Sequence, residues 1–168
     1  MSAGQPRQAL GPAQRLVGLA AVCLAAVALA LLAQHGLGMQ PCPWCILQRV
    51  IYLAIALVCL LGALLPARSA RQGLAGVALV LALLGAAAAV WQHVVAAKSS
   101  SCNLTLADKI LNALGVESAL PALFQVTANC ADAAVIVAGV PFEYWSLALY
   151  SLLAAGAATV FLQMRARA

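Results

Sequence analysis

Charged residues are scarce in this sequence. Only 8% of its 168 residues are charged, and 65% are hydrophobic. Soluble globular domains carry about 25% charged residues, so the composition excludes a soluble domain and indicates an integral membrane protein. The net charge of +5 does not indicate nucleic-acid binding, because the cations gather beside the apolar runs.

Several kinds of chemistry are also missing. The sequence offers no serine triad, phosphate-binding loop or carboxylate cluster. Haem attachment at the Cys42-x-x-Cys45 motif is excluded because Ile46 occupies the position where that motif needs histidine. Thiol chemistry is what remains.

Four apolar runs are each long enough to cross about 30 Å of hydrocarbon as a helix. They cover approximately residues 16–33, 46–65, 74–97 and 144–164. We therefore predict an all-α integral membrane protein. Residues 1–168 are expected to form a single membrane domain, a four-helix transmembrane bundle with a long periplasmic loop at 98–143 that contains a short interfacial helix.

The arginines predict the orientation of the bundle. Six of them flank the spans at what would be a single side of the membrane, and such residues mark the cytoplasmic face: Arg7, Arg15, Arg68, Arg71, Arg165 and Arg167. Both termini would then be cytoplasmic. The loop 98–143 holds all four acidic residues and would face outward. The tryptophans lie near the outer ends of their spans, as membrane-belt residues should: Trp44, Trp91 and Trp145.

A short helix is expected inside the outer loop. Thr105 and Asp108 form a helix-opening box with Asp in place of Glu, and Gly115 ends the pattern. Apolar residues recur between them on one helical face, which suits a helix lying on the bilayer. A second apolar stretch, residues 135–142, returns the chain to the membrane surface.

Cys42 and Cys45 form a close pair that is able to cycle between dithiol and disulfide. Half of a zinc site is the alternative for such a pair, but we expect no bound metal. The pair directly precedes the second span, at its outer end, where an oxidising compartment lets disulfides persist. Cys23 and Cys59 lie deep in spans and are expected only to pack.

Two further residues near the outer surface are candidates for the site. Arg49 is four residues after Cys45 and shares its helical face, where a cation favours a thiolate. The alternative for Arg49 is snorkelling to the headgroups, although a charge inside a span usually marks a functional site. His93 is expected at a similar depth and is a candidate proton or hydrogen-bond donor to a bound headgroup, or an interfacial histidine without that role.

A second cysteine pair, Cys102 and Cys130, lies in the outer loop in polar surroundings that a soluble protein would reach. A close pair at the membrane can exchange with something in the bilayer, and a distant pair in a loop with something in solution. Electrons would then pass from a soluble dithiol through both pairs to a lipid-soluble acceptor.

These features resemble the bacterial DsbB family, membrane quinone reductases that reoxidise the periplasmic thiol oxidase DsbA. The resemblance covers about residues 16–164. It rests on four spans, the outer cysteines, and two local motifs: Pro41-Cys42-x-x-Cys45 followed by Gln48-Arg49, and Pro141-x-x-x-Trp145-Ser146-Leu147. It implies a bacterial inner-membrane protein with periplasmic cysteines, a DsbA-type partner, and ubiquinone or menaquinone as cofactor.

The resemblance also implies a role for each cysteine. The DsbA thiolate would attack Cys102, the released Cys130 would attack Cys42, and Cys45 would be freed beside the quinone. The implied disulfides are Cys42–Cys45 and Cys102–Cys130. Arg49 would stabilise the Cys45 thiolate and the charge that develops on the quinone.

This sequence departs from the best-known members of the family within the dithiol motif. It has Pro43-Trp44 between the cysteines and a neutral Gln48 before the arginine. Pro43 lacks a backbone N–H that would be available to a thiolate. Three alternatives to this family remain: an enzyme of the vitamin K epoxide reductase type, a zinc-binding membrane protein, and a structural subunit whose cysteines only staple loops.

Overall fold

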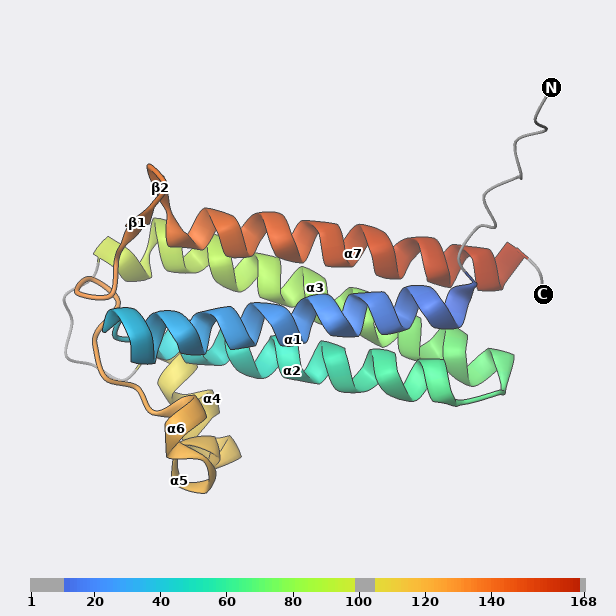
Figure 1. Ribbon diagram of the computed structural model, residues 1–168, viewed down its shortest axis with the longest axis horizontal. Helices are drawn as coiled ribbons and strands as arrows, with labels where there is room; N and C mark the ends of the chain where they lie inside the picture. The colour runs from blue at the N-terminus through green and yellow to red at the C-terminus, as the bar shows by residue number, and fades with distance from the viewer. Residues whose placement is uncertain (1–10, 99–104, 167–168) are drawn as a thin grey trace.

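The computed structural model describes residues 11–98 and 105–166, so Cys102 lies outside the described residues. Figure 1 shows the arrangement of the helices and strands. In chain order they are α1 (Pro12–Leu37), α2 (Pro43–Leu64), α3 (Arg68–Val94), the 3-10 turn η1 (Ala96–Lys98), α4 (Leu106–Leu114), α5 (Val116–Ala119), α6 (Pro121–Phe124), β1 (Ile136–Val137), β2 (Val140–Pro141) and α7 (Phe142–Ala166).

The four predicted spans are confirmed as the long helices α1, α2, α3 and α7, each long and apolar enough to cross a membrane. α1 and α7 extend beyond the predicted run at both ends, because an apolar run marks only the part that suits hydrocarbon, whereas α2 and α3 both begin and end earlier than predicted. α1 packs against α2, α2 against α3, and α3 most extensively against α7. Four sequential crossings bring the start of α1 and the end of α7 to the same end of the bundle (Figure 1).

Leucines cover the outside of the bundle. Their side chains are more than half exposed on all four long helices, and examples are Leu29, Leu32, Leu57, Leu83, Leu152 and Leu162. In water such a surface would cause the protein to aggregate, whereas lipid tails are as apolar as leucine and solvate it. The surface therefore agrees with a bundle that is surrounded by a bilayer.

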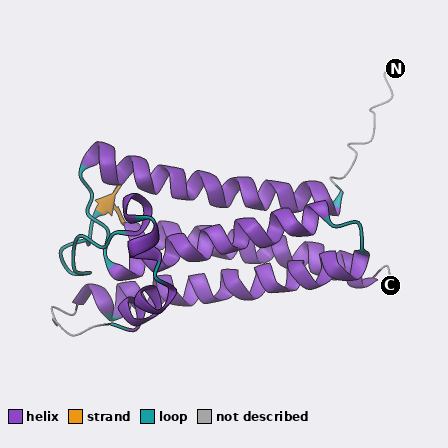
Figure 2. Cartoon of the chain, turned by 90° about the horizontal axis from the view of Figure 1, so that it is seen from below, coloured by secondary structure: helices purple, strands orange, loops and turns teal. Residues whose placement is uncertain are grey.

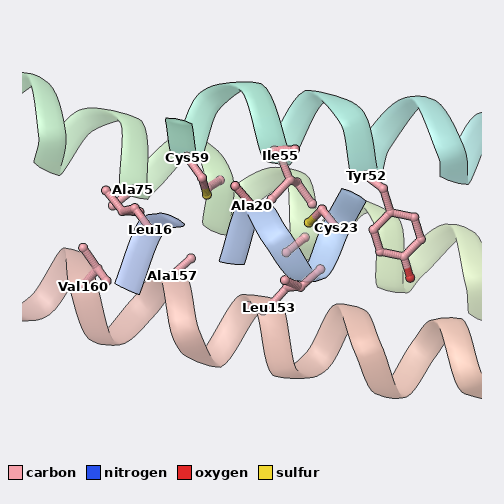
Figure 3. Close-up of a cluster of buried hydrophobic side chains, with 14 of the residues drawn as sticks. Leu16, Ala20, Cys23, Tyr52, Ile55, Cys59, Ala75, Leu153, Ala157 and Val160 are labelled. Atoms are coloured by element: carbon pink, nitrogen blue, oxygen red, sulfur yellow. The ribbon is translucent and has the colours of Figure 1, made fainter. Parts of the chain in front are cut away.

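The interior of the bundle is filled by small and medium-sized apolar side chains (Figure 3). Cys23 and Cys59 are 0% and 1% exposed there, so they pack in the core as expected. Toward the cysteine end of the bundle, which carries Cys42, the rings of Tyr52 and Tyr150 stack with their centroids 4.2 Å apart and an interplanar angle of 4°.

Two arginines cap helix ends at the opposite end of the bundle. Arg68 donates from Nη2 to the carbonyl oxygen of Met164 at 2.8 Å. Arg71 donates from Nε to Gly62 at 3.0 Å and from Nη2 to Leu65 at 2.9 Å. The last carbonyl groups of a helix have no partner within it, so these side chains hold the ends of α2 and α7 as well as carrying positive charge.

Most of the loops and both strands lie at the cysteine end of the bundle, in the segment between α3 and α7 (Figure 2). Within it, α4, α5 and α6 form a small cluster beside α2 (Figure 1). α4 begins with the expected box, in which Thr105 Oγ1 accepts from the backbone of Asp108 and the Asp108 carboxylate accepts from the backbone of Thr105. Gly115 ends the helix at a φ of 63°.

A β-hairpin that was not predicted precedes α7. Strands β1 and β2 pair antiparallel through Ile136 with Pro141 and Val137 with Val140. The two turn residues, Ala138 and Gly139, have φ values of 52° and 80°, as a two-residue hairpin turn requires. Alanine at a positive φ gives no turn signal in a sequence, which is why the apolar stretch was expected only to return the chain to the surface.

Gly85→Ala should lower the melting temperature of the protein, because α3 and α7 approach too closely at Gly85 for any side chain. A Cβ there would overlap the ring of Tyr150, which is fully buried. Overpacking of this kind costs about 1–3 kcal/mol. Thermal unfolding in detergent followed by circular dichroism measures the change.

Gly73→Ala is the matched control in the same helix, since a Cβ at Gly73 meets nothing within 4 Å. It should leave the melting temperature unchanged or slightly raised, because alanine favours helix more than glycine does. Equal melting temperatures for the two variants would contradict the packing described here.

Candidate active site

Cys42 and Cys45 meet at the first turn of α2. Cys42 is the N-cap residue, and its sulfur accepts a hydrogen bond from the backbone N–H of Cys45 at 3.4 Å. The two sulfur atoms lie 3.0 Å apart. Pro43 starts the helix at a position where proline is tolerated. The helix start thus brings the two thiols together, and their disulfide stays a prediction.

Cys130 is the third sulfur of the site. It forms a hydrogen bond with Cys42 and accepts another from the backbone N–H of Trp44. The segment before it is tied to the motif, because Thr127 and Ala128 donate their backbone N–H groups to the carbonyl oxygen of Pro41 at 3.1 and 3.3 Å. A peptide far along the chain is therefore folded onto the start of α2.

This packing corrects the expectation that Cys130 is readily reached from solution. Its side chain is only 7% exposed, in an apolar cluster with Ile46, Leu111 and Phe124. Trp44 belongs to the same cluster and is 6% exposed, so it is not a membrane-belt residue, whereas Trp91 and Trp145 are about half exposed. α4 packs against this end of α2, and the cluster that it completes buries Trp44 and Cys130, which the sequence alone predicted to be exposed.

The thiols of Cys42 and Cys130 have pKa values that are shifted in opposite directions. Hydrogen bonding to Cys130 and to Cys45, together with burial, raises the pKa of the Cys42 thiol far above its usual range. The hydrogen bond from Cys42 lowers the pKa of the Cys130 thiol, and the Trp44 N–H acts in the same direction, against the effect of burial. Cys42 is therefore the proton donor of the pair, and Cys130 is the better nucleophile.

Arg49 lies nearly two turns into α2 and is buried, with 6% of its side chain exposed. Its Nη1 donates to Gln34 Oε1 at 2.6 Å and to the carbonyl oxygen of Leu123 at 3.0 Å, and its Nη2 approaches the carbonyl of Ala30 at 3.5 Å. These partners lie on α1 and α6, inside the protein. The geometry does not match snorkelling, in which the guanidinium would reach out to water or headgroups.

A cavity of about 590 Å³ opens beside Cys45 and Arg49. Its walls are mainly apolar and come from α1, α2, α7 and the segment after Ala128. Its lining includes small residues of α1, together with Trp145 and Leu149 of α7. An apolar cavity whose lining includes a thiol and a fixed cation suits a lipophilic molecule that carries hydrogen-bond acceptors.

His93 is not brought to this cavity. Its Nε2 lies 3.2 Å from the hydroxyl of Tyr144, and the centroids of the two rings are 4.7 Å apart. The lining residue from this part of α3 is its neighbour Gln92. A role for His93 in binding a cofactor stays a prediction without support from these contacts.

Sequence reasoning missed two functional candidates, Gln92 and Gln34. Gln92 Nε2 donates to the sulfur of Cys45 at 3.4 Å, and its Oε1 accepts from Gln48 Nε2 at 2.7 Å. Gln34 accepts from Arg49, as described above. The sequence did contain a signal for both residues. A glutamine near the end of an apolar span is energetically costly unless its amide is hydrogen-bonded, so such a residue is a candidate for a functional site.

The chain is similar to disulfide bond formation proteins over most of its length. The sequence model of the family "Disulfide bond formation protein DsbB" matches residues 13–160. The disulfide bond formation protein B of Aromatoleum aromaticum is 34% identical over 142 residues, which cover 82% of this chain and 85% of that protein.

Two further relatives show the same degree of similarity. The protein of that name from Herminiimonas arsenicoxydans is 35% identical, over 82% of this chain and 86% of its own length. Disulfide bond formation protein B 1 of Pseudomonas savastanoi pv. phaseolicola is 37% identical, over 83% of each chain.

Cys42→Ala should raise the pH at which Cys130 becomes reactive in the fully reduced protein. The substitution removes the hydrogen bond that stabilises the Cys130 thiolate, so the pKa of Cys130 rises toward its ordinary value. A hydrogen bond to a charged group is worth about 1.5 kcal/mol or more, which corresponds to about one pH unit. Iodoacetamide labelling across a pH series, resolved by site with mass spectrometry, measures the midpoint.

Cys59→Ala is the control, because Cys59 is buried in the middle of the bundle core. Its Cys130 midpoint should equal that of the unmodified protein. The same midpoint in the Cys42→Ala variant would show that Cys42 does not hold the proton for Cys130.

Proposed function

We propose, since this chain belongs to the DsbB family of disulfide bond formation proteins, that it transfers electrons from a periplasmic DsbA-type thiol oxidase to a membrane quinone. As a member of that family it is a multi-pass membrane protein and a thiol oxidoreductase. One observation supports the proposed electron transfer. The sulfurs of Cys130, Cys42 and Cys45 interact in this order, and they lead from the loop to a cavity that is also lined by the buried Arg49.

The first half of the reaction exchanges disulfides. A thiolate of the partner attacks Cys102, the Cys102–Cys130 bond breaks, and Cys130 leaves as a thiolate. Cys130 then attacks Cys42, which breaks the Cys42–Cys45 bond and frees Cys45 as a thiolate. The interaction between Cys130 and Cys42 supports this step, and so does the backbone N–H of Trp44, which stays available to a Cys130 thiolate when Cys42 is in its disulfide.

The second half restores the loop pair. The partner's other thiol attacks the mixed disulfide, which releases the oxidised partner and the thiolate of Cys102. That thiolate attacks Cys130, re-forms the Cys102–Cys130 bond and leaves Cys42 and Cys45 as a dithiol. Two electrons and two protons must leave this dithiol to re-form its disulfide, and a quinone held in the cavity would accept them.

The residues of the cavity fit a quinone, either ubiquinone or menaquinone. Apolar walls from α1 and α7 would hold the ring and the start of the isoprenoid tail, and the donors of Arg49 would meet a ring oxygen. A bound quinone supplies the two-electron oxidising power that a dithiol potential alone lacks. Arg49 contributes a fixed positive charge beside Cys45, and the apolar lining excludes water from the reacting sulfur.

The proposed orientation places this site on the periplasmic side of a bacterial inner membrane, with both termini in the cytoplasm. Arg68 and Arg71 lie at the bundle end opposite Cys42. Cationic loops favour the cytoplasmic face, and an oxidising periplasm suits cysteines that cycle through disulfides.

Cys45→Ser should abolish turnover, because serine cannot form the disulfide whose electrons reduce the quinone. The assay combines purified protein in lipid nanodiscs, a reduced DsbA-type protein and a short-chain ubiquinone, and it follows quinone absorbance. Cys59→Ser is the control and should retain turnover, since Cys59 is buried in the core away from the cavity. Full turnover in the Cys45→Ser variant would remove Cys45 from the pathway.

Arg49→Lys should raise the KM for quinone about tenfold or more, although it keeps the positive charge. A single ammonium group cannot reach Gln34, Leu123 and a quinone oxygen together, as the planar guanidinium can. The KM for the reduced partner should change little, because that protein reacts at the loop. An unchanged KM for quinone would place the acceptor away from Arg49.

A further inference from the structure

A pair of buried amides meets the redox sulfur from the side of α3. Gln48 and Gln92 are each 4% exposed, and their side chains connect α2 to α3 through a hydrogen bond of 2.7 Å. The other end of the Gln92 amide points at Cys45 Sγ, 3.4 Å away. All three side chains line the cavity.

The hydrogen bond between the glutamines couples the orientations of the two amides. Gln48 Nε2 donates to Gln92 Oε1, which leaves the NH2 group of Gln92 directed at Cys45. An amide NH2 group is only a donor. The NH2 group therefore stabilises a thiolate at Cys45. In the opposite orientation of Gln92, a carbonyl oxygen would face the sulfur and destabilise the thiolate.

Arg49 does not replace this contact. Its Nη1 and Nη2 groups are directed at Gln34, Leu123 and Ala30, so its charge acts on Cys45 through space. Gln92 donates a side-chain hydrogen bond to the sulfur itself, in addition to the contact of 3.0 Å between Cys45 Sγ and Cys42 Sγ. The amide also has no titratable proton to return to the sulfur, so it stabilises the thiolate without neutralising it.

We propose that Gln92 is a further catalytic residue, which holds Cys45 as a thiolate facing the cavity, and that Gln48 is a positioning residue which orients the Gln92 amide. This inference rests on the proposed function for its role in turnover. It gives a purpose to the neutral Gln48 of the dithiol motif: a second amide is needed to fix the first, since a glutamine alone can rotate to present either atom.

The test measures the alkylation of Cys45 in fully reduced protein in nanodiscs. Iodoacetamide rates are taken across a pH series and resolved by site with mass spectrometry. The midpoint of the profile reports thiolate stability, and the plateau at high pH reports access of the reagent to the cavity. A merely structural role for Gln92 would move the plateau and leave the midpoint in place.

Gln92→Leu should move the Cys45 midpoint up by about one pH unit, because the thiolate loses a hydrogen bond. Gln92→Glu keeps the shape of the side chain but sets a carboxylate beside the sulfur, so it should move the midpoint at least as far. Gln48→Leu should cause a smaller shift in the same direction, since the Gln92 amide is then free to rotate. Circular dichroism verifies that each variant is folded.

Gln163→Leu is the matched control, because it makes the same substitution in α7 next to Met164, whose carbonyl oxygen accepts from Arg68 at the opposite end of the bundle. Its midpoint should be that of the unmodified protein. Unchanged midpoints in Gln92→Glu and Gln48→Leu would overturn the proposal, whatever happens to the plateau. The measurement needs neither quinone nor partner, so its outcome is separate from the turnover test of Cys45→Ser.

Discussion

A guanidinium inside an apolar bundle has to find hydrogen-bond acceptors, and this requirement at Arg49 shapes the whole cysteine end. A buried charge without partners costs several kcal/mol. Arg49 takes an amide oxygen from Gln34 on α1 and a carbonyl oxygen from Leu123 on α6. The second bond draws the loop down onto α2, and the same segment continues to the Pro41 carbonyl and to Cys130. Satisfying one charge therefore helps to bring a distant cysteine to the start of the helix.

The two ends of the bundle use polar side chains in different ways. At one end Arg68 and Arg71 donate to the last carbonyl groups of neighbouring helices, where water or lipid headgroups would otherwise be needed. At the other end, amides and a guanidinium point inward and meet at Cys45 or at the cavity beside it. The arrangement places an amide donor on the Cys45 sulfur and a fixed charge near it in surroundings of low polarity, where each has a larger effect on charge than it would in water.

Much of this architecture could be predicted from sequence because it depends on local patterns. Four apolar runs gave the spans, and the Thr105–Asp108 box gave the start of α4. The rotation of α3 about its axis could not be predicted, and it decides that Gln92 rather than His93 faces the cavity, since adjacent residues on a helix point about 100° apart. That rotation depends on how α3 packs against its neighbours. The burial of Cys130 was missed for a similar reason, because it depends on contacts between segments far apart in the chain.

Pro43 illustrates how the same motif can tolerate an unusual residue. By sequence its missing N–H removes a donor that a thiolate would use. In the structure Pro43 is the first residue of α2, and the hydrogen bonds to sulfur come from the next two residues: the N–H of Trp44 to Cys130 and that of Cys45 to Cys42. Both N–H groups are among those that a helix start leaves without partners. Proline also presets the backbone for the first turn, so it fixes the direction of these two donors and takes neither away.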